Sequence, residues 1–235
     1  MHQLRKYTAA EKNLAVAFAF IAGFVDSIGF IFLGGVFLSF MSGNTTRLAT
    51  SAVEGDAGLA WLAGSAVVLF LLGVMEGALV RRIAMRRVPT DRVREAVLAN
   101  TCALFTVASI FVLFDAPTAA IIFASVAIGS MNSIFERAGE VSIPLTYMTG
   151  TLVKMGQRFV DAFFGGTHAA WIEHLKMWAG LSAGALCGAI GFHYLGMDAL
   201  LIATVLTIAI SLVAVLLRIR GRRHGSVVRV SVEPY

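Results

Sequence analysis

Two short polar steps inside apolar sequence hold the residue types best suited to bind a small solute. The first, residues 41–45, reads Met-Ser-Gly-Asn-Thr, and the second, residues 148–151, reads Met-Thr-Gly-Thr. If each step begins a helix, it offers hydroxyl or amide groups beside free backbone N–H groups, which attract anions and carbonyl oxygens. Gly43 and Gly150 would let a ligand approach the backbone closely. The candidate binding residues are Ser42, Gly43, Asn44, Thr45, Thr149, Gly150 and Thr151.

A less specific interpretation of these two steps stays open. Ser, Asn and Thr are common N-cap residues, so Ser42, Asn44 or Thr45 could simply cap an ordinary helix at the membrane interface. In that case the steps imply no solute.

Asp26 is a second candidate for chemistry. It lies about 18 Å along a helix begun at Leu14, by the 1.5 Å rise per residue. That depth is well inside a bilayer, where a carboxylate is costly and by default suggests function. Asn132, its counterpart in the repeat described below, keeps the hydrogen bonding without the charge. Asp26 is therefore a candidate proton-coupling residue; the alternative is a structural carboxylate bonded to a neighbouring hydroxyl or backbone gap.

Several other charged or polar residues have two interpretations. Glu136, Arg137 and Glu140 could form an ion-pair gate at the cytoplasmic mouth, or a solvated interfacial cluster. Glu76 could be functional, or could snorkel or pair near Arg81. Asn100 could line a path, or could join helices by hydrogen bonds.

Known catalytic and metal-binding patterns are missing from the sequence. There is no P-loop, His-Glu-x-x-His, nucleophile elbow or Cys-x-x-Cys, and the histidines show no metal-ligand spacing. We therefore expect neither an enzyme nor a bound metal or other cofactor.

The composition is that of a membrane protein. The 235 residues are 58% hydrophobic and 14% charged, whereas soluble domains carry about 25% charged residues. Six apolar segments approach the roughly 20 residues that a membrane-spanning helix needs. They are residues 14–41, 59–80, 96–114, 116–135, 175–195 and 197–217. We expect one all-α integral membrane domain over residues 1–235.

The basic residues predict the orientation. Lys and Arg gather before the first span, in the loop at 81–94 and in the tail at 218–235, whereas the loops at 54–58, 115–117 and 193–198 have none. By the positive-inside rule, both termini are cytoplasmic. These arginines lie where membrane insertion needs them, so no nucleic-acid partner is expected.

The chain contains an internal duplication. Three pairs of segments match in the same order: 22–30 with 128–136, 40–48 with 147–155, and 71–79 with 182–190. They align Gly23 with Gly129, Asp26 with Asn132, Gly43 with Gly150, Arg47 with Lys154, Gly73 with Gly184, and Gly77 with Gly188. Repeat one is 14–114 and repeat two is 116–217. Because each holds three spans, the second must be inverted in the membrane, as in many secondary transporters.

The repeat predicts where the two polar steps lie in the membrane. Residues 14–32 are enough to cross the membrane, Gly34 and Gly35 permit a turn, and an extended piece then leads to a short helix over 43–55. In the second copy Pro144 favours an extended piece before a short helix over 149–164. Two half-helices would then aim their N-termini at a common centre, where non-helical backbone must be packed or face water.

The stretch "GFVDSIGFIFLGGVFLSFMSGNTT" resembles the YoaK-like (UPF0700-type) family of bacterial membrane proteins of unknown function. Gly23, Asp26, Met41, Ser42, Gly43 and Asn44 carry the match. The resemblance implies a bacterial inner-membrane location and supplies no substrate. The layout also resembles the sulfate permease-like anion transporters in miniature, which is a fold analogy only.

These patterns predict a secondary transporter or channel for a small anionic or polar solute, bound near the midplane, with or without coupling to protons. The alternative is a non-transporting membrane sensor or assembly scaffold. The expected partners are the lipid bilayer, the solute and a second copy of the chain, packed through glycine-rich helix faces. A transporter needs a polar, wet pocket between 42–45 and 149–151, whereas a scaffold fills that space with side chains.

Overall fold

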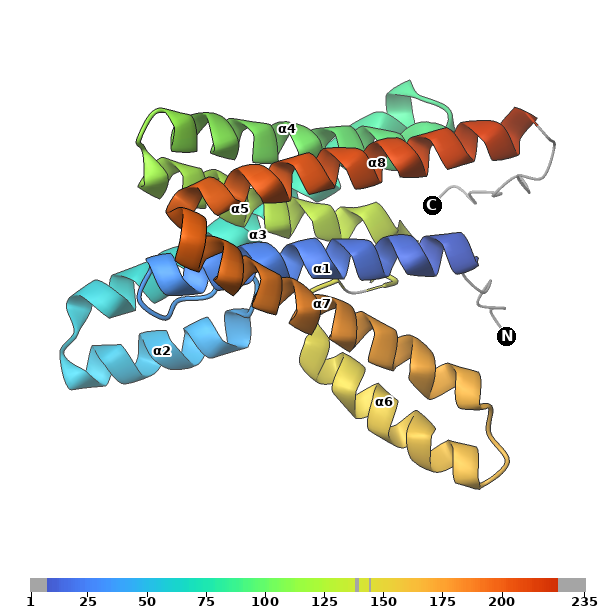
Figure 1. The fold of residues 1–235 in the computed structure, drawn as a ribbon, viewed down its shortest axis with the longest axis horizontal. Helices are drawn as coiled ribbons and strands as arrows, with labels where there is room; N and C mark the ends of the chain where they lie inside the picture. The colour runs from blue at the N-terminus through green and yellow to red at the C-terminus, as the bar shows by residue number, and fades with distance from the viewer. Residues whose placement is uncertain (1–7, 138–139, 144, 224–235) are drawn as a thin grey trace.

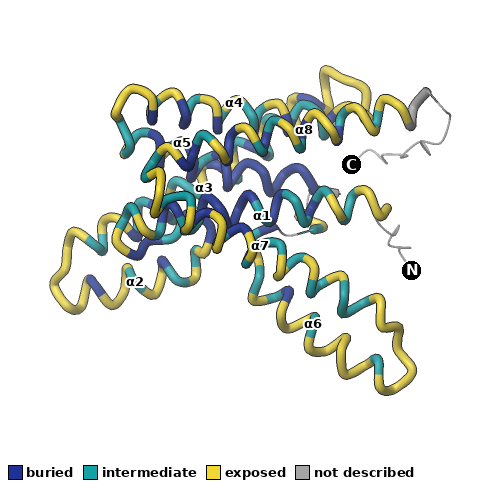
Figure 2. Tube along the Cα trace, viewed as in Figure 1, coloured by how far each residue is buried: buried dark blue, intermediate teal, exposed yellow. Residues whose placement is uncertain are grey.

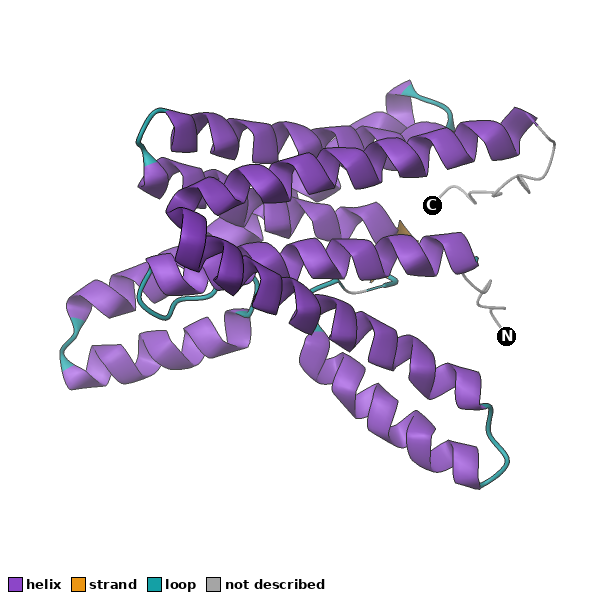
Figure 3. Cartoon of the chain, in the orientation of Figure 1, coloured by secondary structure: helices purple, strands orange, loops and turns teal. Residues whose placement is uncertain are grey.

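The computed structural model describes residues 8–137, 140–143 and 145–223, and in this part the chain forms eight α-helices (Figures 1 and 3). They are α1 (Ala9–Phe32), α2 (Met41–Glu54), α3 (Ala57–Arg87), α4 (Val93–Leu113), α5 (Pro117–Met131), α6 (Met148–Phe163), α7 (His168–Leu195) and α8 (Ala199–Arg223). Three 3₁₀ turns, η1 (Thr90–Arg92), η2 (Asn132–Phe135) and η3 (Gly196–Asp198), join some of them. Two very short strands, β1 (Glu136–Arg137) and β2 (Glu140–Val141), pair antiparallel after η2.

Several helices have the length and hydropathy of membrane spans. Five helical stretches qualify: Ala9–Phe32, Ala57–Arg87, Thr90–Leu113, Pro117–Phe135 and His168–Arg220. The last has 53 residues because it contains both α7 and α8. The chain changes direction between them at η3, where Gly196 has φ 58° (Figure 1). The prediction of a helical membrane protein is therefore confirmed, with α7 and α8 on the two predicted segments 175–195 and 197–217.

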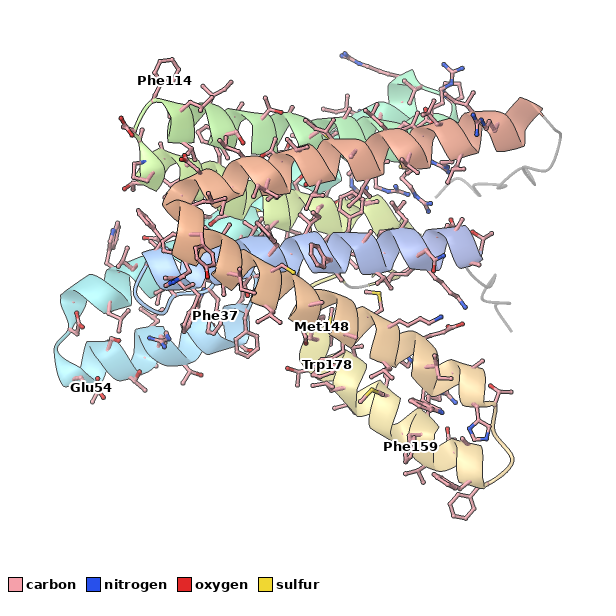
Figure 4. All side chains as sticks on the ribbon, in the orientation of Figure 1. Phe37, Glu54, Phe114, Met148, Phe159 and Trp178 are labelled. Atoms are coloured by element: carbon pink, nitrogen blue, oxygen red, sulfur yellow. The ribbon has the colours of Figure 1, made fainter. Side chains whose placement is uncertain are left out.

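Helices α2 and α6 are too short to span a bilayer. Their 14 and 16 residues correspond to about 21 and 24 Å, less than the roughly 30 Å of hydrocarbon. Each packs on the helix that follows it, α2 on α3 and α6 on α7. Both begin toward the middle of the molecule and run outward in different directions, toward Glu54 and past Phe159 (Figures 1 and 4). They start at Met41 and Met148, slightly before the predicted positions.

The core is built mainly from α1 and α5 (Figure 2). Fully buried side chains include Phe18 and Ile28 on α1 and Ile128 and Met131 on α5. Helix α3 instead exposes a row of large apolar side chains, among them Leu72 and Met75. Such a surface suits contact with lipid.

Two helix pairs, α1–α7 and α3–α5, are in close backbone contact through glycines. At each of these glycines, a Cβ atom would overlap a backbone carbonyl of the partner helix: Gly23 with Leu181, Gly184 with Phe20, Gly129 with Phe70, and Gly73 with Val126. Small residues let helices approach to this degree. Gly77 and Gly188 are equally close to the backbones of Ser130 and Phe24, so the aligned glycines pack helices within the chain.

Candidate functional site

The chain turns back after α1 through two glycines. Gly34 and Gly35 have φ 66° and 107°, a left-handed region that favours glycine. The N–H of Gly35 donates to the Phe30 carbonyl at 2.7 Å, which closes the turn. Residues 36–40 then lead back to the start of α2, with Val36 and Leu38 fully buried. The predicted turn is therefore present, and the segment after it is packed in protein.

Asp26 holds this segment in place. Its Oδ1 accepts hydrogen bonds from the backbone N–H groups of Leu38 and Ser39, both at 2.7 Å. Non-helical backbone inside a membrane needs such internal partners, because no water is available in the lipid. These contacts give Asp26 a structural role, and proton coupling at Asp26 stays a prediction.

Asn44 holds the same segment from α2. It is fully buried; its Oδ1 accepts from the Phe37 N–H at 3.0 Å, and its Nδ2 donates to the Phe37 carbonyl at 2.6 Å. Both ends of the amide thus bind one residue of the backbone. The candidate solute contact of Asn44 is occupied by the protein in this conformation.

The prediction that Ser42, Asn44 or Thr45 caps α2 is wrong. Phe40 occupies the N-cap position of α2 without a side-chain hydrogen bond. Because the helix starts at Met41, Thr45 lies inside it, and its Oγ1 donates to the Met41 carbonyl at 2.8 Å.

Helix α6 begins in the same manner. Tyr147 occupies its N-cap position, again without a side-chain hydrogen bond. Thr151 Oγ1 donates to the Tyr147 carbonyl at 3.2 Å. Ser42 and Thr149 are exposed in the first turns of α2 and α6. Their hydroxyls are therefore accessible to a ligand.

An aromatic ring lies against each candidate glycine. A Cβ on Gly43 would overlap the Phe40 ring, and a Cβ on Gly150 would overlap the Tyr147 ring. The two pairs have the same spacing in the two matched segments. Phe40 is 41% exposed and Tyr147 65% exposed, so neither ring is enclosed by the protein. The rings cover the glycines, and a ligand could reach the backbone there only after they move.

Each half-helix also carries a cation two turns from its start. The Arg47 guanidinium lies 5.8 Å from the centroid of the Phe30 ring. Among the residues that the structure describes, no carboxylate forms a salt bridge with Arg47 or Lys154. The alignment of the two repeats matches Arg47 with Lys154, but neither cation is among the candidate binding residues predicted from the sequence. The signal that could have identified them is the same charge at the same repeat position.

Two hollows lie between α6 and α7, near the loop that joins them. The larger has a volume of about 710 Å³ and is lined by Lys154, Gln157, Arg158, Asp161 and His174. Arg158 pairs with Asp161 at 3.2 Å. Neither hollow is lined by residues 42–45 or 149–151. The predicted pocket between the two polar steps therefore does not coincide with either of them.

The predicted gate residues lie at the β1–β2 hairpin. Arg81 Nε at the end of α3 pairs with Glu136 Oε1 at 3.4 Å. The backbones of Arg137 and Glu140 face each other in the hairpin, and their side chains lie outside the described part of the chain, as does Pro144. Asn132, the first residue of η2, donates from Nδ2 to the carbonyls of Ile128 and Gly129 on α5, at 3.1 and 3.3 Å.

Comparison with known proteins assigns this chain to a family. The model of a family described as "Protein of unknown function (DUF1275)" matches residues 14–213. The chain belongs to this family. The DUF1275 match includes α2, α6 and every candidate site residue.

A curated relative supports the same assignment for this DUF1275 protein. The UPF0700 transmembrane protein RA0705 of Rhizobium meliloti (strain 1021) is 30% identical over 186 residues, which cover 79% of this chain and 78% of the relative. No solved structure matches the chain. The resemblance to a UPF0700-type membrane family is thus confirmed.

Proposed function

We propose that this DUF1275 protein is a secondary transporter or channel for a small anionic or polar solute. We place it in the bacterial inner membrane, with both termini in the cytoplasm. One observation carries the proposal: two short helices begin toward the middle of the molecule, and each bears a cation, Arg47 or Lys154, that has no salt-bridge partner in the described residues.

We further infer that the two halves are inverted repeats. The glycine contacts support this, since Gly23 meets α7 as its match Gly129 meets α3. Helices α1 and α5 run in opposite directions in Figure 1, as do the outward paths of α2 and α6. Inverted repeats with interrupted helices at the midplane are typical of secondary transporters. The proposed solute site lies between the starts of α2 and α6.

The charge of the solute follows from the two cations. An arginine or lysine at membrane depth costs about 2.5–3.5 kcal/mol on insertion scales. Arg47 is also expected in the outer half of the membrane, where the positive-inside rule disfavours it. An anionic solute would supply the partner that the described residues do not provide. The two cations therefore favour an anion over a neutral polar solute.

A non-transporting scaffold is the second candidate. It is favoured by the hydrogen bonds of Asp26 and Asn44, which both hold backbone, and by the rings that cover Gly43 and Gly150. For transport, Phe40 and Tyr147 must change rotamer. Exposed side chains do so within nanoseconds, so these rings are compatible with either function.

A homodimer would need a surface other than the glycine faces. Those faces suggested contact between subunits, but they pack within the chain in α1–α7 and α3–α5. The exposed apolar row on α3 is one surface that a second copy or lipid could cover.

Flux into proteoliposomes tests the proposal. Wild-type protein should carry at least one of a panel that includes chloride, nitrate, sulfate, phosphate and acetate. Gly43→Leu should abolish this flux by filling the start of α2. The matched control is Gly156→Leu on α6, where a Cβ would meet nothing within 4 Å. If no solute moves and none changes the melting temperature, the scaffold is the correct assignment.

A further inference from the structure

Glu76 is a carboxylate within an apolar span that the proposed site does not use. It lies on α3, inside the apolar segment 59–80. Arg81 follows it by about 7.5 Å along the helix axis, from the 1.5 Å rise, and pairs with Glu136 at 3.4 Å. Glu76 is therefore deeper in the membrane than the ion pair at the cytoplasmic mouth.

Asn100 joins Glu76 to a third helix. Asn100 on α4 donates from Nδ2 to Glu76 Oε2 at 3.0 Å and to Ser130 Oγ on α5, also at 3.0 Å. Next to Glu76, a Cβ on Gly77 would overlap the Ser130 carbonyl, so α3 and α5 touch at this level. The carboxylate thus lies where α4 bridges the close α3–α5 pair.

Asn100 provides a hydrogen bond to Glu76 and no positive charge. An amide can orient a carboxylate but cannot neutralise it. No Lys or Arg in the described residues forms a salt bridge with Glu76. A carboxylate at this depth is costly, so a proton is the simplest group that can remove the charge.

The charged groups on the neighbouring elements are engaged or distant along their helices. Helix α5 and η2 contain no titratable residue over 117–135. On α4, Glu95 and Arg94 lie nearer the cytoplasmic end, and Arg94 pairs with Glu11 at 3.0 Å. On α2, Arg47 and Glu54 lie beside the N-terminal half of α3, away from Glu76. Arg81 is held by Glu136. Glu76 is therefore the titratable group at the α3–α4–α5 contact.

We propose that Glu76 binds and releases a proton, with Asn100 holding the carboxyl group in place and Ser130 fixing the amide of Asn100. The carboxylate takes a proton from cytoplasmic water to become a neutral acid, and returns it to water on release; no other bond changes. Coupling of this proton to solute movement rests on the proposed transport function, whereas proton binding itself does not. Asp26 is the competing assignment, but its Oδ1 already accepts two backbone donors that fix residues 38 and 39.

Chemical labelling tests proton binding without any knowledge of the solute. The full chain in sodium-free lipid nanodiscs is treated with dicyclohexylcarbodiimide, which reacts with protonated carboxyl groups in apolar surroundings. Mass spectrometry then locates the adduct over a pH series. We expect the adduct on Glu76, with a yield that falls as pH rises, and none on Asp26. An adduct on Asp26 instead, or no adduct at any pH, overturns the proposal.

Infrared difference spectra after a pH jump compare two matched variants, Glu76→Gln and Asp26→Asn. The carbonyl band of a protonated carboxyl should disappear in Glu76→Gln and remain in Asp26→Asn. Its persistence in Glu76→Gln, or its loss in Asp26→Asn, contradicts the assignment. The labelling in wild-type protein decides the question even if a variant does not fold.

Flux separates this inference from the proposed function. With a solute that moves, Glu76→Gln should lose accumulation driven by a pH gradient and keep downhill flux. A Glu76 adduct without any flux leaves proton binding standing and removes the transport function. Flux that does not depend on the pH gradient, with no adduct on Glu76, supports the transport function and removes the proton-binding proposal.

Discussion

Asp26 on α1 accepts the backbone N–H of Leu38 at 2.7 Å, across the turn that reverses the chain. The same oxygen accepts a hydrogen bond from the N–H of Ser39. Asn44 binds the backbone of Phe37, the residue before Leu38. Three successive residues of the segment 36–40 are thus fixed by side chains from α1 and α2. This arrangement sets where α2 begins, and so where the first polar step lies.

Removal of the Asp26 carboxylate should destabilise the protein. Hydrogen bonds to charged groups contribute about 1.5–3 kcal/mol each, and the two N–H groups would remain buried without partners. We expect Asp26→Ala to lower the free energy of unfolding by about 2–4 kcal/mol. Asp26→Asn should cost less, because the amide oxygen can still accept. Denaturant unfolding in mixed micelles measures the stability of both variants. Equal stability of Asp26→Ala and wild type would contradict the structural role of the two Asp26 hydrogen bonds.

Alanine at the helix-contact glycines should be more harmful than at an open glycine. Gly184→Ala and Gly73→Ala would each force a Cβ into a partner backbone, so α1–α7 or α3–α5 must separate. We expect a loss of about 1–3 kcal/mol, the range for overpacking. Gly156→Ala, with open space around it, should be neutral or stabilising by up to about 1 kcal/mol. Thermal unfolding in detergent compares them; equal effects of the substitutions would argue against close packing.

The helices could be predicted from sequence because their signals are local. The apolar runs around Phe18 and Ile128, the glycine turn at Gly34 and Gly35, and the polar steps each carry their own pattern. The capping prediction failed because the partner of Asn44 is the Phe37 backbone, a contact that only the tertiary turn creates.

The polar contacts between helices had no such signal. Glu76, Asn100 and Ser130 are far apart in the chain, and hydropathy assigns each to a separate span. Only the packing of α3, α4 and α5 shows that they meet. The common charge of Arg47 and Lys154 was visible in the alignment of the repeats, but its meaning depended on which carboxylates are close enough to pair.

The proposed inverted orientation of the two repeats makes a direct prediction about membrane sidedness. In a background with Cys102→Ser and Cys187→Ser, single cysteines replace Glu54 at the end of α2 and Phe164 after α6. A membrane-impermeant maleimide should label Glu54→Cys from outside intact cells, and label Phe164→Cys only after the cytoplasmic face is exposed. Arg87→Cys at the end of α3 is the cytoplasmic control. Labelling of Glu54→Cys and Phe164→Cys from the same side would exclude inverted half-helices.

Arg47 and Lys154, which have no salt-bridge partner among the described residues, should decide which solutes are carried. A charge-assisted hydrogen bond contributes about 1.5–3 kcal/mol, so loss of one from the bound state should reduce anion uptake by about 10–100-fold, at 1.4 kcal/mol per factor of ten. We expect this reduction in Arg47→Gln and Lys154→Gln. Arg47→Lys should be intermediate, because lysine keeps the charge without the planar fork.

The matched control for these cations is Arg158→Gln on α6. It removes the same charge from a residue that already pairs with Asp161 at 3.2 Å, so uptake should stay within about twofold, the effect of a weak exposed pair. Initial rates in proteoliposomes at fixed ionic strength compare the four variants with wild type. If Arg47→Gln, Lys154→Gln and Arg158→Gln reduce uptake equally, surface potential explains the effect. If none does, the solute is neutral and the cations serve orientation alone.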